Sequence, residues 1–206
     1  MKHEWRKHEK PLYMPKEKPE LVEVPPMKFI TISGMGDPNK EGFADRISAL
    51  YPIAYAIRMM PKGGYTPEGY FEYTVYPLEG VWDLTEKGRQ ADTLIKDELL
   101  YTIMIRQPQF VTEEVFELAR EKAKKKKDNP LFEEVKFEVI HDGLCVQMLH
   151  VGPYDDEPRT FEKMKEYIDE KSLKIRTLKH REIYLSDMRR TEPSKLKTVL
   201  RYLVES

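Results

Sequence analysis

The sequence is poor in cysteine, in long apolar runs and in net charge of either sign. Its only cysteine, Cys145, excludes an intramolecular disulfide and is typical of proteins from reducing compartments. No apolar run approaches the ~20 residues that a membrane-spanning helix needs, and the first residues lack the apolar region of a signal peptide. Because 35 lysines and arginines face 36 aspartates and glutamates, the net charge of −1 gives no general attraction to nucleic acid. We therefore expect a cytoplasmic protein with no membrane segment and no direct contact with nucleic acid.

Motifs for cofactors and metals are also missing. Gly34-Met35-Gly36 lacks the third glycine and the strand-to-helix spacing of a dinucleotide-binding loop, so these glycines predict only a turn. No second histidine or cysteine stands at metal-ligand spacing from His150 or His180, and no phosphate loop or Ser-His-Asp arrangement is visible. The sequence therefore predicts neither a cofactor nor a metal.

Alternating and helical apolar patterns are present in a mixture that predicts an α+β fold. Charged residues and repeated prolines indicate an extended arm over residues 1–20. A first βαββ unit is predicted over about 21–108, a linking helix over 111–127 and a second βαββ unit over about 131–206. The predicted elements are a strand at 21–35, a helix at 43–57 that Pro52 should kink or divide, a strand at 70–76, a turn at 77–80, a strand at 99–106, a hairpin with a two-residue type I′ turn at Asp142-Gly143, a helix beginning after Asp156, the strand around Glu182 and a strand at 196–204.

Weak internal similarity supports a pseudo-symmetric duplication of one unit. The segment 100–106 resembles 196–201, and Glu72 occupies a place in the first unit that matches Glu182 in the second. Tyr70 and Tyr76 flank Glu72 on the same predicted face. If helices cover one face of each antiparallel sheet, the free faces form a central groove, and ligand sites favour such junctions.

Glu182 is the most informative residue, because it interrupts an apolar strand. Alternation places Ile183 and Leu185 on one face and Glu182 and Tyr184 on the other. Burying an unpaired carboxylate costs several kcal/mol. Glu182 is therefore expected to face either ordinary solvent or a recess that holds something cationic or reactive.

Five lysines lie between positions 122 and 127, at the end of the predicted linking helix. Two interpretations stay open. The lysines form either a solvated helix end, where cations are favourable, or a patch that binds phosphate.

Four stretches of the sequence together carry a resemblance to a known family. They are Pro77-Leu-Glu-Gly-Val-Trp82, Tyr101-Thr-Ile-Met-Ile-Arg-Gln-Pro108, Gly143-Leu-Cys-Val-Gln-Met-Leu-His-Val-Gly-Pro-Tyr154 and His180-Arg-Glu-Ile-Tyr-Leu-Ser-Asp187. With these stretches the chain resembles the GyrI-like small-molecule-binding family, which includes effector-binding domains of AraC-type and MerR-type multidrug regulators. The resemblance covers nearly the whole chain after about residue 20. It implies a pseudo-symmetric pair of βαββ units with a central groove, in which a glutamate at the position of Glu182 meets cationic, aromatic drugs. No helix-turn-helix precedes the domain, so direct transcriptional control is not expected.

Stand-alone members of the family resemble two functional types. One binds lipophilic cations, and the other hydrolyses cyclopropanoid DNA-alkylating agents by adding water to the strained ring. Hydrolysis needs a carboxylate that orients or deprotonates water, a hydrogen-bond donor that stabilises the developing phenolate and aromatic walls that hold a flat substrate. Glu182 suits the catalytic role, with Glu72 as a second candidate. The binding residues that the resemblance implies are Tyr70, Tyr76, Trp82, Tyr101, Met104, Met148, His150, Tyr154 and Tyr184.

Three functions stay open at this point, and so does the question of whether the protein is an enzyme. The preferred one is a detoxifying hydrolase of cyclopropanoid genotoxins. The second is a non-catalytic protein that binds, sequesters or senses hydrophobic, often cationic drugs, and the third, an inhibitor of DNA gyrase, follows from the family name alone. Residue types do not decide, because Trp82, Met104 and Met148 pack in cores as readily as they line pockets.

Overall fold

The computed structural model describes residues 1–206, which form two compact units. Unit 1 contains Met1–His3, Met27–Tyr76 and Trp82–Ile140, and unit 2 contains Glu4–Pro26, Pro77–Val81 and His141–Ser206. Most of the N-terminal segment therefore belongs to the same unit as the last third of the chain. No helix combines the length and the apolar character that crossing a membrane requires.

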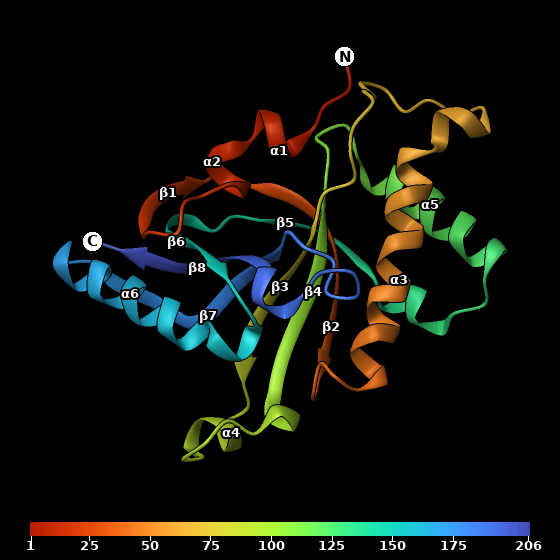
Figure 1. The fold of residues 1–206 in the computed structure, drawn as a ribbon. Helices are drawn as coiled ribbons and strands as arrows, with labels where there is room; N and C mark the ends of the chain where they lie inside the picture. The colour runs from red at the N-terminus through yellow and green to blue at the C-terminus, as the bar shows by residue number, and fades with distance from the viewer. The chain divides into compact units, whose positions relative to one another are not determined.

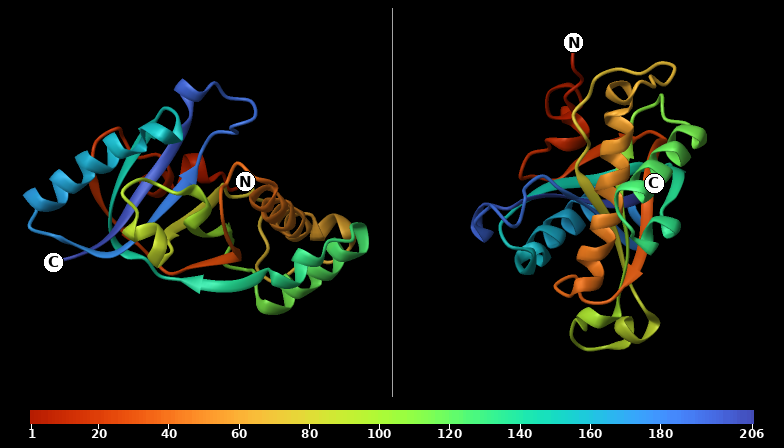
Figure 2. Two further views of the ribbon diagram at one scale, coloured as in Figure 1. Left: turned by 90° about the horizontal axis from the view of Figure 1, so that it is seen from below. Right: turned by 90° about the vertical axis from the view of Figure 1, so that its right-hand side faces the viewer.

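Unit 1 is built on antiparallel strands, with β2 lying between β5 and β4. The long helix α3 packs on β2 and β4 through Leu50, Ile53 and Ile57, which are fully buried. Helix α5 lies beside α3, as the views in Figure 1 and Figure 2 agree. The elements of this unit are β2 (Met27–Met35), α3 (Glu41–Arg58), α4 (Glu86–Gln90), β4 (Leu99–Gln107), α5 (Glu113–Lys126) and β5 (Lys136–Ile140).

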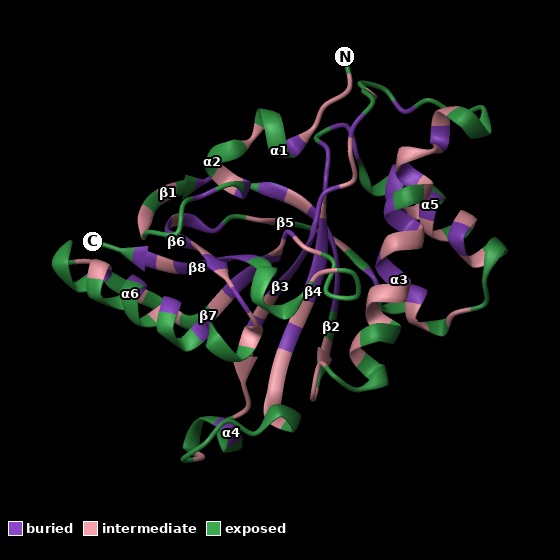
Figure 3. Ribbon diagram, in the orientation of Figure 1, coloured by how far each residue is buried: buried purple, intermediate pink, exposed green.

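Unit 2 has the strand order β1-β6-β8-β7, again antiparallel. Helix α6 covers one face of this sheet and buries Met164 and Ile168 against Val146, Met148 and Leu200. Figure 3 shows buried and half-buried residues along one side of α6 and exposed residues along the other. The elements are α1 (Trp5–His8), α2 (Lys10–Tyr13), β1 (Glu20–Val24), β6 (Gly143–Val151), α6 (Glu157–Glu170), β7 (Lys174–Tyr184) and β8 (Lys197–Glu205), while β3 (Leu78–Leu84) has residues in both units.

The βαββ order occurs twice along the chain, as β2-α3-β3-β4 and as β6-α6-β7-β8. In each copy the last strand lies between the other two, because β4 neighbours β2 and β3 while β8 neighbours β6 and β7. An extra strand pairs with the first strand of each copy, β5 with β2 and β1 with β6. The α+β class and the duplicated βαββ unit predicted from the sequence are confirmed.

The predicted hairpin at Asp142-Gly143 was wrong. Strand β5 pairs with β2 and strand β6 pairs with β1 and β8, so the two strands flanking this turn do not pair with each other. Gly143 has the positive φ of +70° that a tight turn favours, but Asp142 does not, which excludes a type I′ turn. Asp142 instead serves an ion pair, described below.

Four other local predictions differ from the structure. The strand predicted over 21–35 is two strands, because Pro25 and Pro26 lack the N–H groups that a continuous ladder needs. Residues 70–76 form no strand and contribute only an isolated bridge between Tyr73 and His3. Residues 78–80, predicted as part of a turn, begin β3 instead. Pro52 does not divide α3, which continues to Arg58.

Residues 1–20 also differ from the extended arm that the prolines indicated. They contain α1 and α2, whose residues Trp5 and Tyr13 are buried with ring centroids 5.3 Å apart. The backbone carbonyl of Pro11 accepts a 2.6 Å hydrogen bond from Gln147 of β6. Aromatic burial and these polar contacts hold the segment within unit 2.

A buried ion pair lies on the face of the unit 2 sheet opposite α6. Arg181 of β7 is 2% exposed and donates to both carboxylate oxygens of Asp142, at 2.7 and 3.1 Å. Glu79 of β3 lies 3.7 Å from the same guanidinium. Burial acts to lower the pKa of Arg181, but the two carboxylates outweigh it and the pKa is raised, so the guanidinium stays charged.

We expect Arg181→Met to lower the free energy of unfolding by about 3–5 kcal/mol, because it leaves Asp142 and Glu79 buried without their cation. Urea denaturation measures this change. Arg190→Met is the matched control, because Arg190 is largely exposed and its pairing with Asp187 is worth about 0–1 kcal/mol. Equal losses in the two variants would contradict a stabilising role for the buried pair.

Candidate functional site: a buried carboxyl pair in unit 2

Three side chains of β7 lie on the sheet face that α6 covers. His180, Glu182 and Tyr184 alternate along the strand and stand opposite Tyr202, Leu200 and Thr198 of β8. Leu200 and Tyr202 belong to the cluster that packs against α6. Glu182 is consequently only 8% exposed, although it carries a carboxylate.

Two neighbours on β7 hydrogen-bond the Glu182 carboxylate. The Tyr184 hydroxyl donates to Oε2 at 2.7 Å, and Nε2 of His180 lies 2.9 Å from Oε1. No lysine or arginine forms an ion pair with Glu182, whose only ion-pair partner is His180. The carboxylate is therefore held in a fixed orientation by a phenol and an imidazole.

A second carboxyl group, Glu157, meets Glu182 from the first residue of α6. Glu157 is 7% exposed, and the two side chains share a hydrogen bond. Burial, followed by the charge of Glu182 and this hydrogen bond, raises the pKa of Glu157 from its ordinary value of 4.5 to about 10. At neutral pH the Glu157 carboxyl is consequently protonated and neutral.

The pair lies beside the N-terminal turn of α6. Backbone N–H groups at such a terminus favour negative charge, which helps to offset the cost of burying it. Pro158 at the start of the helix loses nothing, since its position needs no N–H partner. Two carboxyl groups, one shared proton and a helix terminus therefore make a compact anionic centre.

Aromatic rings surround this centre. The rings of Tyr154 and Tyr184 meet edge to face with centroids 6.0 Å apart. Phe161, one helical turn after Glu157, packs edge to face on His180 at 4.7 Å and against Tyr202 at 5.1 Å. Burial raises the pKa of Tyr154 to about 12, with further contributions from Glu182 and Glu157, so its hydroxyl remains a neutral donor at physiological pH.

His150 supports the site from beneath instead of forming part of it. The imidazole is fully buried, with Nδ1 2.8 Å from the Thr160 hydroxyl and Nε2 3.0 Å from the Pro153 carbonyl. Because a carbonyl can only accept, Nε2 donates to Pro153. These bonds tie β6 to the segment that carries Tyr154 and Glu157.

Two buried polar atoms near this centre have no hydrogen-bond partner within the protein. They are Oε1 of Glu157 and Oγ1 of Thr198, the residue opposite Tyr184 on β8. Unpaired buried polar atoms cost about 1–3 kcal/mol each and are uncommon in folded proteins. The same short stretch of sheet thus combines an unusual buried charge with unused hydrogen-bonding capacity.

The remaining predicted site residues lie in unit 1, apart from Met148. Met148 is 3% exposed in the core cluster under α6. Trp82 and Tyr101 pack together with Phe43, with centroid distances of 5.0 to 5.6 Å. Met104 is buried within β4.

Glu72 and its two tyrosines do not form a centre like that around Glu182. Glu72 is exposed, and the strand of unit 1 that corresponds to β7 is β3, not the segment that carries Glu72. The Tyr70 hydroxyl donates to the carbonyl of Arg58 at 2.8 Å, and the Tyr76 ring faces the Arg106 guanidinium at 4.6 Å. The predicted equivalence between Glu72 and Glu182 was therefore wrong.

Sequence reasoning missed Glu157, His180 and Phe161 as members of the site. The alternation that identified Glu182 also places His180 on its face, so that signal was available. Helical spacing from Glu157 to Phe161 puts both on one side of α6, but nothing local indicates that Glu157 meets β7. No group of three or more histidine, cysteine, aspartate or glutamate side chains is placed to hold a metal ion.

A family model described as the GyrI-like small molecule binding domain matches residues 17–203. The chain belongs to the GyrI-like family. A solved structure described as a hydrolase from Listeria innocua is 40% identical, with a TM-score of 0.89, over 99% of this chain and 100% of that one. A second Listeria innocua structure, described as an uncharacterized conserved protein, is 41% identical, with a TM-score of 0.91, over the same shares of the two chains.

A more distant likeness extends to the fold alone. The EcmrR C-terminal domain is 14% identical, with a TM-score of 0.53, and the match covers 92% of this chain and 98% of that domain. A search among curated proteins finds no match.

The carboxyl pair predicts an unusual pH dependence of stability. Because the pKa of Glu157 is higher in the folded protein than in the unfolded chain, folding retains a proton that the unfolded chain releases between about pH 4.5 and 10. The stability from this group is complete below that range and is lost as pH rises through it. We expect the free energy of unfolding of the wild type, relative to Glu157→Gln, to fall between pH 5 and pH 9.

Urea denaturation at pH 5, 7 and 9 measures this difference, whose slope cannot exceed about 1.4 kcal/mol per pH unit. Glu162→Gln is the matched control, because Glu162 is exposed on the same helix. A constant difference between the wild type and Glu157→Gln across the range would show that Glu157 is not held protonated.

Proposed function

We propose that this protein binds flat, hydrophobic small molecules beside the Glu157–Glu182 pair and hydrolyses cyclopropanoid DNA-alkylating compounds there. The observation that carries the proposal is a carboxylate oriented by Tyr184 and His180, paired with a protonated carboxyl and walled by aromatic rings. Membership of a small-molecule-binding family supports the binding part. The full-length similarity to a protein described as a hydrolase supports the catalytic part.

Hydrolysis needs a base for the water, a donor for the developing phenolate and aromatic walls for the substrate, and the site offers a candidate for each. The water oxygen bonds to a carbon of the three-membered ring, the strained carbon–carbon bond breaks, and its electron pair moves through the conjugated ring to the carbonyl oxygen, which becomes a phenolate. Glu182 receives the proton that the water gives up. The phenolate then takes a proton to yield the phenol.

Burial of the pair favours this direction of proton transfer. Before the reaction Glu157 is protonated and lies beside Glu182 in a poorly solvated place. A proton taken up by the Glu182 carboxylate removes a buried charge and with it the desolvation penalty. The hydroxyl of Tyr154, a neutral donor whose pKa is raised to about 12, is suited to stabilise the developing phenolate.

We expect Glu182→Gln to lower kcat/KM for ring opening of a duocarmycin-type cyclopropanoid by about 10²-fold or more, the usual range for losing a general base. Chromatography of the ring-opened alcohol measures the rate. Glu162→Gln, which changes an exposed glutamate of α6, keeps the wild-type rate. Quantitative recovery of intact cyclopropanoid after long incubation with the wild type would reject hydrolysis and leave binding alone.

A second candidate function is the non-catalytic binding of lipophilic cations, which the absence of any lysine or arginine partner for Glu182 favours. In this case the negative charge of the pair neutralises the ligand. We expect Glu182→Gln to weaken binding of a lipophilic cation at least tenfold and to leave binding of its neutral isostere unchanged. Calorimetry with the two ligands tests this, and equal losses for both would show that the charge is not what Glu182 contributes.

A further inference from the structure

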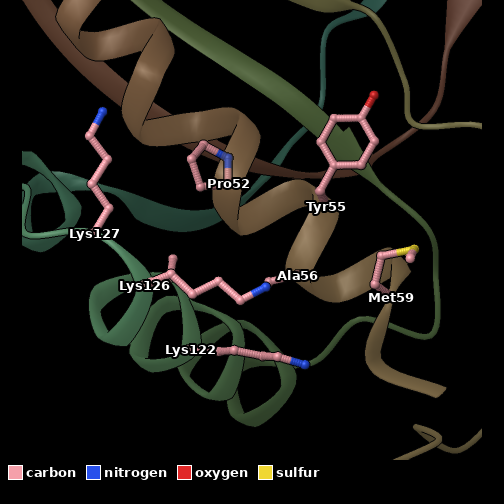
Figure 4. A pocket seen from close by; sticks show the side chains of 8 residues that line it. Pro52, Tyr55, Ala56, Met59, Lys122, Lys126 and Lys127 are labelled. Carbon is pink, nitrogen blue, oxygen red and sulfur yellow. The ribbon is translucent and has the colours of Figure 1, made fainter. Parts of the chain in front are cut away.

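A cavity of about 220 Å³ lies in unit 1 between α3 and α5, and none of its lining residues belongs to the carboxyl-pair site. Figure 4 shows the side chains that line it. Its floor is apolar, formed by Pro52 and Ala56 of α3 and by Ala123 of α5. Met59, whose thioether adapts to different shapes, and Tyr55, whose ring is 48% exposed, complete the α3 side.

The opposite rim carries only positive charge. Lys122, Lys126 and Lys127 line the cavity from the end of α5, and no lining residue is acidic. None of the three forms an ion pair, whereas Lys124 on the same helix pairs with Glu121 at 3.0 Å and also with Glu133. Lys122 and Lys126 extend in the same general direction in Figure 4, so an anion placed between their ammonium groups would be stabilised.

The side chains are arranged to meet such an anion beside the apolar floor. In Figure 4, Lys126 extends from α5 across to α3 and ends near Ala56, and Lys122 extends in the same general direction. A Cβ added at Gly63 would lie 2.8 Å from Nζ of Lys122, so this ammonium lies against the short 3₁₀ helix Met60–Gly63 that follows α3.

A simpler account covers part of this arrangement. Lysines in the last turn of a helix interact favourably with its dipole, which explains Lys124 and its successors without any ligand. It explains neither Lys122, which precedes the last turn, nor the apolar floor beneath the charges.

We propose that this cavity binds a compact amphiphilic anion, with its apolar body against Pro52, Ala56 and Ala123 and its charged group between Lys122 and Lys126. Lysine ammoniums act as point charges without the bidentate geometry of arginine, so the site selects for charge and size and accepts a carboxylate, sulfonate or phosphate. A volume of about 220 Å³ suits a body of one or two fused rings.

The test uses 2-naphthoate as the anion and 2-naphthalenemethanol as its neutral counterpart, with the full-length protein. Calorimetry gives the dissociation constants, and amide chemical shifts locate the ligand. We expect 2-naphthoate to shift the amides of Ala56, Met59 and Ala123, and to bind at least tenfold more tightly than the alcohol. Binding should weaken further as salt is raised, since the lysines are partly exposed.

Two variants test separately the positive charge of the lysines and the free volume at the cavity floor. Lys122→Gln combined with Lys126→Gln should raise the dissociation constant for 2-naphthoate at least tenfold, while Lys125→Gln, an exposed lysine of α5 outside the cavity, leaves it unchanged. Ala56→Leu should abolish binding by filling the floor with all lysines in place. Circular dichroism on each variant confirms folding.

Binding that the lysine pair does not affect, equal binding of the alcohol, no binding at millimolar 2-naphthoate, or shifts at residues around Glu182 instead would each overturn the proposal. Glu182→Gln should leave 2-naphthoate binding unchanged. The outcome is therefore independent of the function proposed for the carboxyl pair.

Discussion

The negative charge of Glu182, buried on a sheet face that a helix covers, is the constraint around which unit 2 is arranged. An apolar strand with one carboxylate facing α6 would be unstable unless its neighbours stabilised that charge. Tyr184 and His180 supply two hydrogen bonds, and Glu157 supplies a proton held far above its ordinary pH range. His150 then fixes the backbone segment that brings Glu157 into place. The hydrogen bonds from Tyr184 and His180 hold the Glu182 carboxylate in one geometry, which is what a binding or catalytic site requires.

The two faces of the same sheet accommodate charge by different means. Opposite α6, the buried guanidinium of Arg181 is matched by the full charges of Asp142 and Glu79. Arg201, also 2% exposed, instead donates to Gln147 at 2.9 Å and to the carbonyl of Leu12, and burial lowers its pKa. The charges on that face are balanced by partners within the protein, which indicates a role in stability. The face under α6 keeps a net negative charge and unpaired acceptors, which is why we assign function to it.

Local patterns in the sequence predicted local structure well, and non-local partners poorly. Period-two alternation placed Glu182 and Tyr184 on one face, and the strong apolar pattern of β4 gave its bounds nearly to the residue. The hairpin at Asp142-Gly143 failed because a turn signal says where the chain reverses and not which strand it pairs with. Glu157 was missed for a related reason: its importance arises only when the start of α6 meets β7. Residues 1–20 were predicted as an extended arm from their charge and prolines, and this failed because the burial of Trp5 and Tyr13 outweighed local propensity.

Residues 4–26 belong to unit 2, although most of that unit is encoded after residue 140. During synthesis this segment leaves the ribosome before most of unit 1, and its β-sheet neighbour β6 leaves only after all of unit 1. Unit 1 can complete most of its own sheet in the meantime, since nearly all of it lies between residues 27 and 140, with only Pro77–Val81 of that stretch assigned to unit 2. Until β6 is made, β1 has no strand to pair with, and closing so long a loop is slow. A nascent chain halted near residue 140 would thus contain a folded unit 1 and an unpaired segment 4–26, which chaperones and proteases could reach.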